Sequence, residues 1–277
     1  MRSACLFWPG SEAEIQGRRP SYYLHFDDKL DDDKRVDQVV AWLKLSPALR
    51  PHFITLYYSN VDHAGHNYGP DSEEVRAAVH HVDAMVGDLV AKIAPLHLPV
   101  DFVVVADHGM VALQGGPVTL SESADLSDFH TEGSFLYPKP DADVQETYEE
   151  FLAHPDSRYK VYRRAEVPAY LHFDANPREG DPVVIPNGPY TLRAQAASEG
   201  EGKTHRGGHG FNPRTMPEMK AIFFAEGPDV RPGIQLRPFE NVNIYPFIAE
   251  ILRLTAPPVD GTLEVLRPAL KVSHDKR

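Results

Sequence analysis

The stretch HFITLYYSNVDHAGHNYGP, residues 52–70, joins a strand-like run to an unusual set of polar side chains. Its first half is rich in β-branched and aromatic residues, which predicts a strand. Asp62 and His66 follow, and Gly65 between them is expected to let the connecting backbone fold closely. A carboxylate and an imidazole placed in this way can offer an oxygen and a nitrogen ligand to one cation. We therefore predict part of a metal site directly after this strand.

Strand-like and helix-like segments alternate on both sides of this stretch. The uninterrupted apolar character of residues 100–107 is typical of a strand that is covered on both faces. The alternation predicts an α/β fold with a mainly parallel sheet and helices on both faces. In such folds ligand sites lie at the carboxyl ends of the strands. Strands are expected at residues 3–8, 52–59, 100–107 and 219–227, and helices at residues 34–45, 71–93 and 241–254.

Residues 111–203 differ in character from the rest of the chain. They are rich in proline, glycine and aspartate, with short apolar pieces such as DPVVIP and PYTLRA. The many aromatic residues in this segment favour a packed subdomain over a linker. We predict an inserted α+β subdomain here.

Two further clusters carry residues able to bind a metal. Asp107 and His108 follow the buried strand, and His209 lies in the glycine-rich loop THRGGHGFNP. Either cluster alone also fits an ordinary turn. Three clusters of this composition together favour zinc or a similar divalent ion, and two-metal sites that hydrolyse phosphoesters use the same residue types. His63 and His205 are second choices, because their neighbours explain the clusters better.

Composition excludes several other classes of protein. The formal net charge of −12 argues against binding to a nucleic-acid polymer, which requires a basic face. A small anionic substrate is compatible with that charge, because bound metal ions can reverse the local field. Cys5 is the only cysteine, so the chain has no intramolecular disulfide. No apolar run is long enough to cross a membrane, and the amino-terminal run is too short for a signal peptide.

The segments FWPGSE, TLYYSNVDHAGHNYGP, DHGM, GGHGFNP and MKAIFFAEGP resemble, in order and spacing, motifs of the nucleotide pyrophosphatase/phosphodiesterase family. This family belongs to the alkaline phosphatase superfamily, and the likeness extends over residues 6–266. It implies two zinc ions at the carboxyl edge of an alkaline-phosphatase-like sheet. The implied ligands are Asp62, His66 and His209 for one zinc ion, and Asp107 and His108 for the other.

The resemblance also implies aromatic residues in the substrate cleft. The matching positions are Trp8, Phe26 and Tyr57. A nucleotide base can stack on rings so placed, although each ring also fits ordinary core packing. The expected substrate is a small phosphodiester, and nucleotide pyrophosphates, dinucleotides and phospholipid head groups all remain open.

One part of the family pattern has no counterpart in this sequence. The family uses an aspartate ligand on a first strand and a nucleophilic threonine that opens an early helix, both before FWPGSE. Thr55, Thr119 and Thr131 do not open a helix after a turn, so no catalytic residue is assigned. Residues 1–277 are therefore interpreted as a partial catalytic domain without the first strand and the nucleophile helix, and inactive alone.

Two other interpretations remain at this point. The chain could be a metal-binding protein without catalytic activity, or a related zinc phosphomonoesterase or phosphonate hydrolase. Location is also inferred only through the resemblance, which implies an exported parent protein in the periplasm or outside the cell. The single cysteine favours a bacterial source.

Overall fold

The computed structural model describes residues 1–196 and 205–271, and it divides the chain into two compact units. The first unit consists of Met1–Val61, Ala77–Asp107 and Ala221–Arg277, and the second of Asp62–Arg76 and His108–Lys220. The second unit contains the predicted insert and extends beyond it at both ends. Residues 197–203 of that insert lie outside the described residues.

The first unit contains a parallel sheet of three strands, in the order β2-β1-β3. The strands are β1 (Ser3–Leu6), β2 (Tyr22–Leu24) and β3 (Phe53–Leu56). Helix α1 (Asp32–Leu43) connects β2 to β3 and buries Val39, Val40, Trp42 and Leu43 against the sheet. The predicted strand–helix–strand crossover is therefore confirmed, and the register places Leu6 beside both Leu24 and Leu56.

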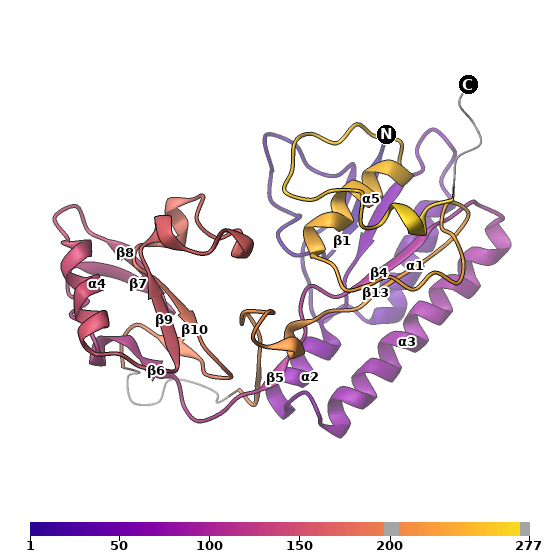
Figure 1. The fold of residues 1–277 in the computed structure, drawn as a ribbon. Coiled ribbons are helices and arrows are strands. Elements are labelled where there is room, and N and C mark those ends of the chain that lie inside the picture. The colour runs from indigo at the N-terminus through magenta and orange to yellow at the C-terminus, as the bar shows by residue number, and fades with distance from the viewer. Residues whose placement is uncertain (197–204, 272–277) are drawn as a thin grey trace. The chain divides into compact units, whose positions relative to one another are not determined.

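A second pair of strands in this unit is antiparallel. Strand β4 (Phe102–Val105) pairs with β13 (Phe223–Glu226), and the two lie side by side in Figure 1. The chain passes through the second unit between these strands and returns directly into β13, so no helical crossover forces a parallel arrangement. Helix α5 (Ile244–Ile251) packs Phe247 against Phe223. Helix α3 (Glu73–Ile93) precedes β4 along the chain, and together these elements complete the predicted α/β fold.

The second unit begins within helix α2 (Asn60–Tyr68) and has an α+β composition. Its largest core cluster includes Phe129, Leu136 and Phe151. The remaining elements of this unit are β5 (Val111–Ala112), β6 (Val118–Thr119), β7 (Phe129–Glu132), β8 (Phe135–Pro138), α4 (Val144–Ala153), β9 (Tyr159–Tyr162), β10 (Val183–Pro186), β11 (Leu192–Arg193) and β12 (Gly207–Gly208).

Short 3₁₀ helices connect many of these elements in both units. They are η1 (Ala94–Leu96), η2 (Leu120–Glu122), η3 (Arg164–Glu166), η4 (Ala169–Leu171), η5 (Pro177–Glu179), η6 (Pro217–Met219), η7 (Asn241–Asn243) and η8 (Arg267–Ala269).

Strands β3 and β4 are less buried than their apolar sequences predict. Every residue of both strands is only half-buried. Among the described residues, β3 pairs only with β1 and β4 only with β13, so each strand has one edge without a strand partner. Helix α3 likewise buries only Ile93, while Val79 and Val90 are 49% and 43% exposed. Unpaired apolar edges of this kind promote association between chains.

We therefore expect the purified chain to self-associate as its concentration rises. Replacing Val79 by lysine and Val90 by glutamate should reduce this association, because both side chains are exposed and their charge disfavours apolar contact. Light scattering coupled to size-exclusion chromatography measures the effect. Val259→Lys is the matched control, since Val259 is 45% exposed and lies outside α3. A wild-type chain that stays monomeric at all concentrations would contradict the prediction.

Candidate metal centre

Helix α2 carries Asp62 and His66 on one face. No helix was expected here from the sequence, and the structure shows one over Asn60–Tyr68. Residues four apart lie one turn above each other, and Asp62 Oδ1 is 3.4 Å from His66 Nε2. The two side chains thus meet through helical periodicity and not through a folded loop.

Gly65 has a different role from the one expected from the sequence. It lies inside α2 and is buried, where glycine costs about 1 kcal/mol relative to alanine. A Cβ atom at this position would collide with the sulfur of Met110. Gly65 therefore permits a close approach between the helix and Met110, which explains why a poor helix former occupies the site.

Gly207 likewise lies close to Gly65 and to Met110. A Cβ atom on Gly207 would collide with the carbonyl oxygen of Gly65 and lie 2.7 Å from the Met110 sulfur. The backbone N–H of Arg206 donates to the carbonyl oxygen of His66 at 2.8 Å. Strand β12 is also paired with β5, where Gly208 lies opposite Val111. These contacts fasten the loop that carries His209 to helix α2.

A backbone carbonyl fixes the tautomer of His66. Its Nδ1 lies 2.9 Å from the carbonyl oxygen of Gly207. A carbonyl can only accept a hydrogen bond, so Nδ1 carries the proton and Nε2 presents its lone pair. That Nε2 atom lies 3.1 Å from His209 Nε2. Two ring nitrogens this close together could both act as ligands to one cation.

His108 joins this group. Its Nδ1 lies 3.0 Å from the carbonyl oxygen of Gly109, so Nε2 is the nitrogen able to act as a ligand. The His108 ring stacks on His209, with centroids 3.5 Å apart and an interplanar angle of 12°. The ligand atoms of Asp62, His108 and His209 all lie within 4.8 Å of one another.

The grouping differs in part from the ligand sets implied by the family resemblance. Those sets placed His108 with Asp107 on a second ion, whereas the structure brings His108 to Asp62 and His209. Asp107 is exposed and is the last residue of its segment in the first unit. A second ion on Asp107 and His108 stays a prediction.

The residues present fit a divalent cation. Asp62 Oδ1 is buried and accepts no hydrogen bond from any described residue. His66 Nε2 and His209 Nε2 lie 3.4 and 3.7 Å from it, which is outside good hydrogen-bonding distance. A buried carboxylate oxygen without a partner is costly, and a bound cation would remove that cost. One carboxylate with several imidazoles is a ligand set that suits zinc.

The two second-choice histidines are placed differently. His63 is exposed and lies one position beyond Asp62, which turns it about 100° around the helix axis. His205 packs edge-on against the His66 ring, with centroids 5.0 Å apart. It is therefore a neighbour of a ligand candidate and is not part of the metal-ligand group found among the described residues.

The three aromatic residues expected to contact a substrate all lie in the first unit. Trp8 and Phe26 each follow the end of their strand by two positions, and Tyr57 follows β3 directly. Because β1, β2 and β3 are parallel and in register, these positions lie at one edge of the sheet. Trp8 is 40% and Phe26 47% exposed, while Tyr57 is half-buried.

None of the three threonines considered from sequence is set up as a nucleophile. Thr55 lies inside β3 and donates its hydroxyl hydrogen to Cys5 Sγ at 3.1 Å. Thr119 is buried in β6 and accepts a hydrogen bond from Arg193 Nε. Thr131 lies within the β7–β8 hairpin. The absence of a catalytic residue from this chain stays a prediction.

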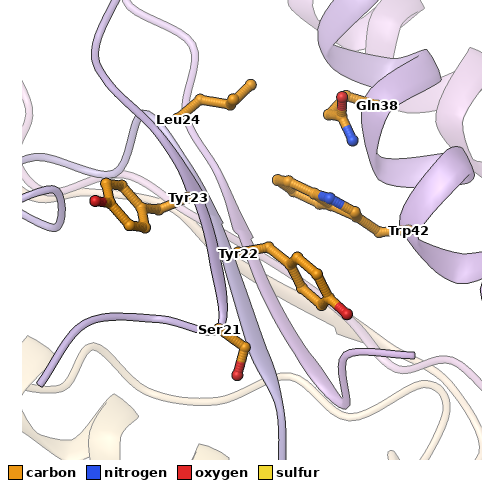
Figure 2. A pocket seen from close by; sticks show the side chains of 6 residues that line it. All are labelled: Ser21, Tyr22, Tyr23, Leu24, Gln38 and Trp42. Carbon is orange, nitrogen blue, oxygen red and sulfur yellow. The ribbon is translucent and has the colours of Figure 1, made fainter. Parts of the chain in front are cut away.

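An open hollow of about 340 Å³ lies between β2 and α1. Figure 2 shows Trp42 and Gln38 on the helix and Tyr22 on the strand, and Tyr22 stacks on Trp42 with ring centroids 6.2 Å apart. No sequence pattern indicated this hollow, and none of the candidate site residues lines it.

Close packing around Met110 leads to a test of the metal centre. Gly207→Ala should lower the free energy of unfolding by about 1–3 kcal/mol, because the clash involves backbone that must move. It should also weaken zinc binding, since the loop bearing His209 shifts away from α2. Chemical denaturation and a competitive zinc titration measure the two effects. Gly116→Ala in the same unit, where a Cβ meets nothing within 4 Å, should change neither.

The chain is similar in sequence to a known family of phosphodiesterases. The family model described as "Type I phosphodiesterase / nucleotide pyrophosphatase" matches residues 1–212. Human ectonucleotide pyrophosphatase/phosphodiesterase family member 1 is 32% identical over 98% of this chain. The venom phosphodiesterase CdcPDE of Crotalus durissus collilineatus is 30% identical over 98% of the chain. The chain spans only 30% and 34% of the lengths of these two relatives.

A solved structure is also similar over almost the whole chain. Murine ectonucleotide pyrophosphatase / phosphodiesterase 5 superposes with a TM-score of 0.86 at 25% identity, covering 98% of this chain and 72% of its own. The murine protein has also been solved as an inactive threonine-to-alanine variant in complex with AMP. No helix among the described residues is long and apolar enough to cross a membrane.

Proposed function

Because the chain belongs to the type I phosphodiesterase / nucleotide pyrophosphatase family, we propose that it supplies the metal ligands and base contacts for zinc-dependent hydrolysis of nucleotides. The bond cleaved is a phosphodiester or pyrophosphate bond. The observation that carries this proposal is the convergence of Asp62, His66, His108 and His209, with the buried Asp62 Oδ1 that accepts no hydrogen bond from described residues.

Each group has a specific task in this proposal. Asp62, His66 and His209 hold one zinc ion, and His108 with Asp107 holds a second. Zinc, when bound, supplies Lewis-acid stabilisation of the negative charge on the phosphoryl oxygens. The Gly207 carbonyl keeps the proton on His66 Nδ1, so that Nε2 stays available as a ligand. The rings of Trp8, Phe26 and Tyr57 stack on the base of the substrate.

The chemistry also needs a nucleophile, which we do not assign to this chain. Thr55 and Thr119 are engaged inside strands, and Thr131 lies in a hairpin. An inactive threonine variant exists for the murine relative. We propose that none of these three threonines performs the attack.

The metal ligands can be tested without measuring activity. Asp62→Ala and His209→Ala should each lower zinc affinity by more than the 10- to 100-fold typical of losing an outer-shell partner, because a ligand atom is removed. Elemental analysis and competition with a chromogenic chelator give stoichiometry and affinity. His63→Ala is the control, being exposed on the same helix. Unchanged zinc binding in both ligand variants would show the assignment to be wrong.

Base recognition predicts a preference for nucleotides over phosphate. The zinc-loaded chain should bind thymidine monophosphate about tenfold more tightly than inorganic phosphate, since stacking of one base contributes ~1–3 kcal/mol. Trp8→Ala should remove most of that preference and leave phosphate affinity unchanged. Isothermal titration calorimetry with both ligands measures the ratio. Equal affinities in the wild type would rule out these rings as a base site.

Turnover provides the strictest check. The zinc-loaded chain should hydrolyse the nitrophenyl ester of thymidine monophosphate no faster than its Asp62→Ala/Asp107→Ala double variant, because a correctly positioned nucleophile accounts for much of the rate. Absorbance of the released nitrophenolate follows the reaction. Metal-dependent turnover by the unaided chain would mean that one of its own residues attacks phosphorus.

The names of the relatives suggest where in the cell the protein acts. The similar proteins carry the words "ectonucleotide" and "venom" in their names. We propose that the parent protein is likewise exported, to the periplasm or the exterior of a bacterial cell.

A further inference from the structure

One buried guanidinium is linked to all three aromatic positions proposed to contact the base. Arg35 is 2% exposed, and its Nη1 donates to the carbonyl oxygen of Tyr57 at 3.2 Å. Its guanidinium carbon lies 5.0 Å from the centroid of the Phe7 ring. Phe7 directly precedes Trp8 and packs edge-on against Phe26, with centroids 5.6 Å apart.

Helical periodicity explains why Arg35 reaches this edge of the sheet. Arg35 and Trp42 are seven residues apart in α1, which is two turns, so both project toward the sheet. Trp42 stacks on Tyr22 at the start of β2, as Figure 2 shows. The other end of the helix therefore places Arg35 at the ends of β1 and β3, where Phe7 and Tyr57 lie.

Burial alone does not account for an arginine here. An apolar side chain of similar volume would cover Phe7 without the desolvation cost of a buried charge. That charge is balanced by Asp32, whose Oδ1 lies 3.2 Å from Arg35 Nε, and Nε also donates to the carbonyl oxygen of Leu30. A planar guanidinium can make these contacts in several directions at once, which a lysine ammonium on a flexible stem cannot reproduce.

The backbone beneath the guanidinium has an unfavourable conformation. Phe7 has φ of 63°, in the left-handed region that non-glycine residues rarely occupy. Such a conformation persists only where surrounding contacts hold it, and the Phe7 side chain is held between Arg35 and Phe26. Ser11 then fixes the next residue, because its backbone N–H and its hydroxyl both donate to the carbonyl oxygen of Trp8.

We propose that Arg35 is a positioning residue for base recognition. It fixes the strand ends that carry Trp8, Phe26 and Tyr57, so that the rings are ordered before the nucleotide binds. A pre-ordered site loses less conformational entropy on binding, which raises affinity for the base and not for phosphate. This inference rests on the proposed function, since it requires the rings to contact a base.

Two variants test the inference without leaving a lone buried charge. Arg35→Lys keeps the charge, and the double variant Asp32→Asn/Arg35→Met removes both partners of the ion pair. In zinc-loaded protein each should reduce the preference for thymidine monophosphate over inorganic phosphate by about tenfold, with phosphate affinity unchanged. Arg50→Lys is the matched control, because Arg50 also donates to a backbone carbonyl, that of Leu45, in the same unit.

A second readout needs neither zinc nor substrate. Trp8 is 40% exposed and Trp42 7% exposed, so quenching of tryptophan fluorescence by acrylamide reports mainly on Trp8. Both Arg35 variants should change the quenching constant, and Arg50→Lys should not. Cooperative thermal unfolding of each variant identifies those that are folded.

The outcomes separate the inference from the proposed function. A nucleotide preference and a quenching constant that stay at wild-type values in folded Arg35 variants would overturn the role of Arg35. A loss of thermal stability with unchanged nucleotide preference and unchanged quenching constant would also overturn this role. Arg35 would then be a purely structural residue. A wild type without nucleotide preference would defeat the base site instead, and altered quenching would then still support the effect of Arg35 on Trp8.

Discussion

The approach of helix α2 to strand β12 determines whether the candidate metal ligands can meet. The Met110 sulfur limits this approach, and a Cβ atom at Gly65 or at Gly207 would collide with that sulfur or with backbone. Only at this separation can the Gly207 carbonyl accept from His66 Nδ1. The tautomer of His66, a candidate metal ligand, thus depends on the absence of a Cβ atom at Gly65 and at Gly207.

In the first unit, the ends of the strands are also held in place by specific contacts. There the strand ends are held by a charged side chain and not by close backbone packing. Arg35 joins the Phe7 ring to the Tyr57 carbonyl, and Asp32 balances its charge. Asp32 also accepts from Asn60 Nδ2 at 3.0 Å, at the first residue of α2. The polar network under the aromatic edge therefore extends, within the first unit, to the side chain of Asn60.

The sequence was most informative where local pattern and packing agree. The apolar spacing of α1 and the length of α3 predicted both helices, because their periodicity does not depend on distant contacts. No helix was expected at residues 60–68, since a glycine and several polar residues follow a strand there. The close contacts of this helix are with Met110 and Arg206, which are distant in sequence. The contribution of His108 to the same group as Asp62 was missed for the same reason: it arises from ring stacking on His209.

The overall charge explains why two kinds of contact are needed. A chain with a formal net charge of −12 repels a phosphate anion at long range, and salt screens this repulsion over about 8–10 Å. In the proposed function, attraction for phosphate would come from cations bound close to the substrate, which the Asp62 and histidine group is suited to hold. Metal ions attract any phosphate alike, so they provide affinity without discrimination. In the proposed function, discrimination between phosphate compounds is left to uncharged surfaces, and we propose the rings at the carboxyl ends of β1, β2 and β3 for that task.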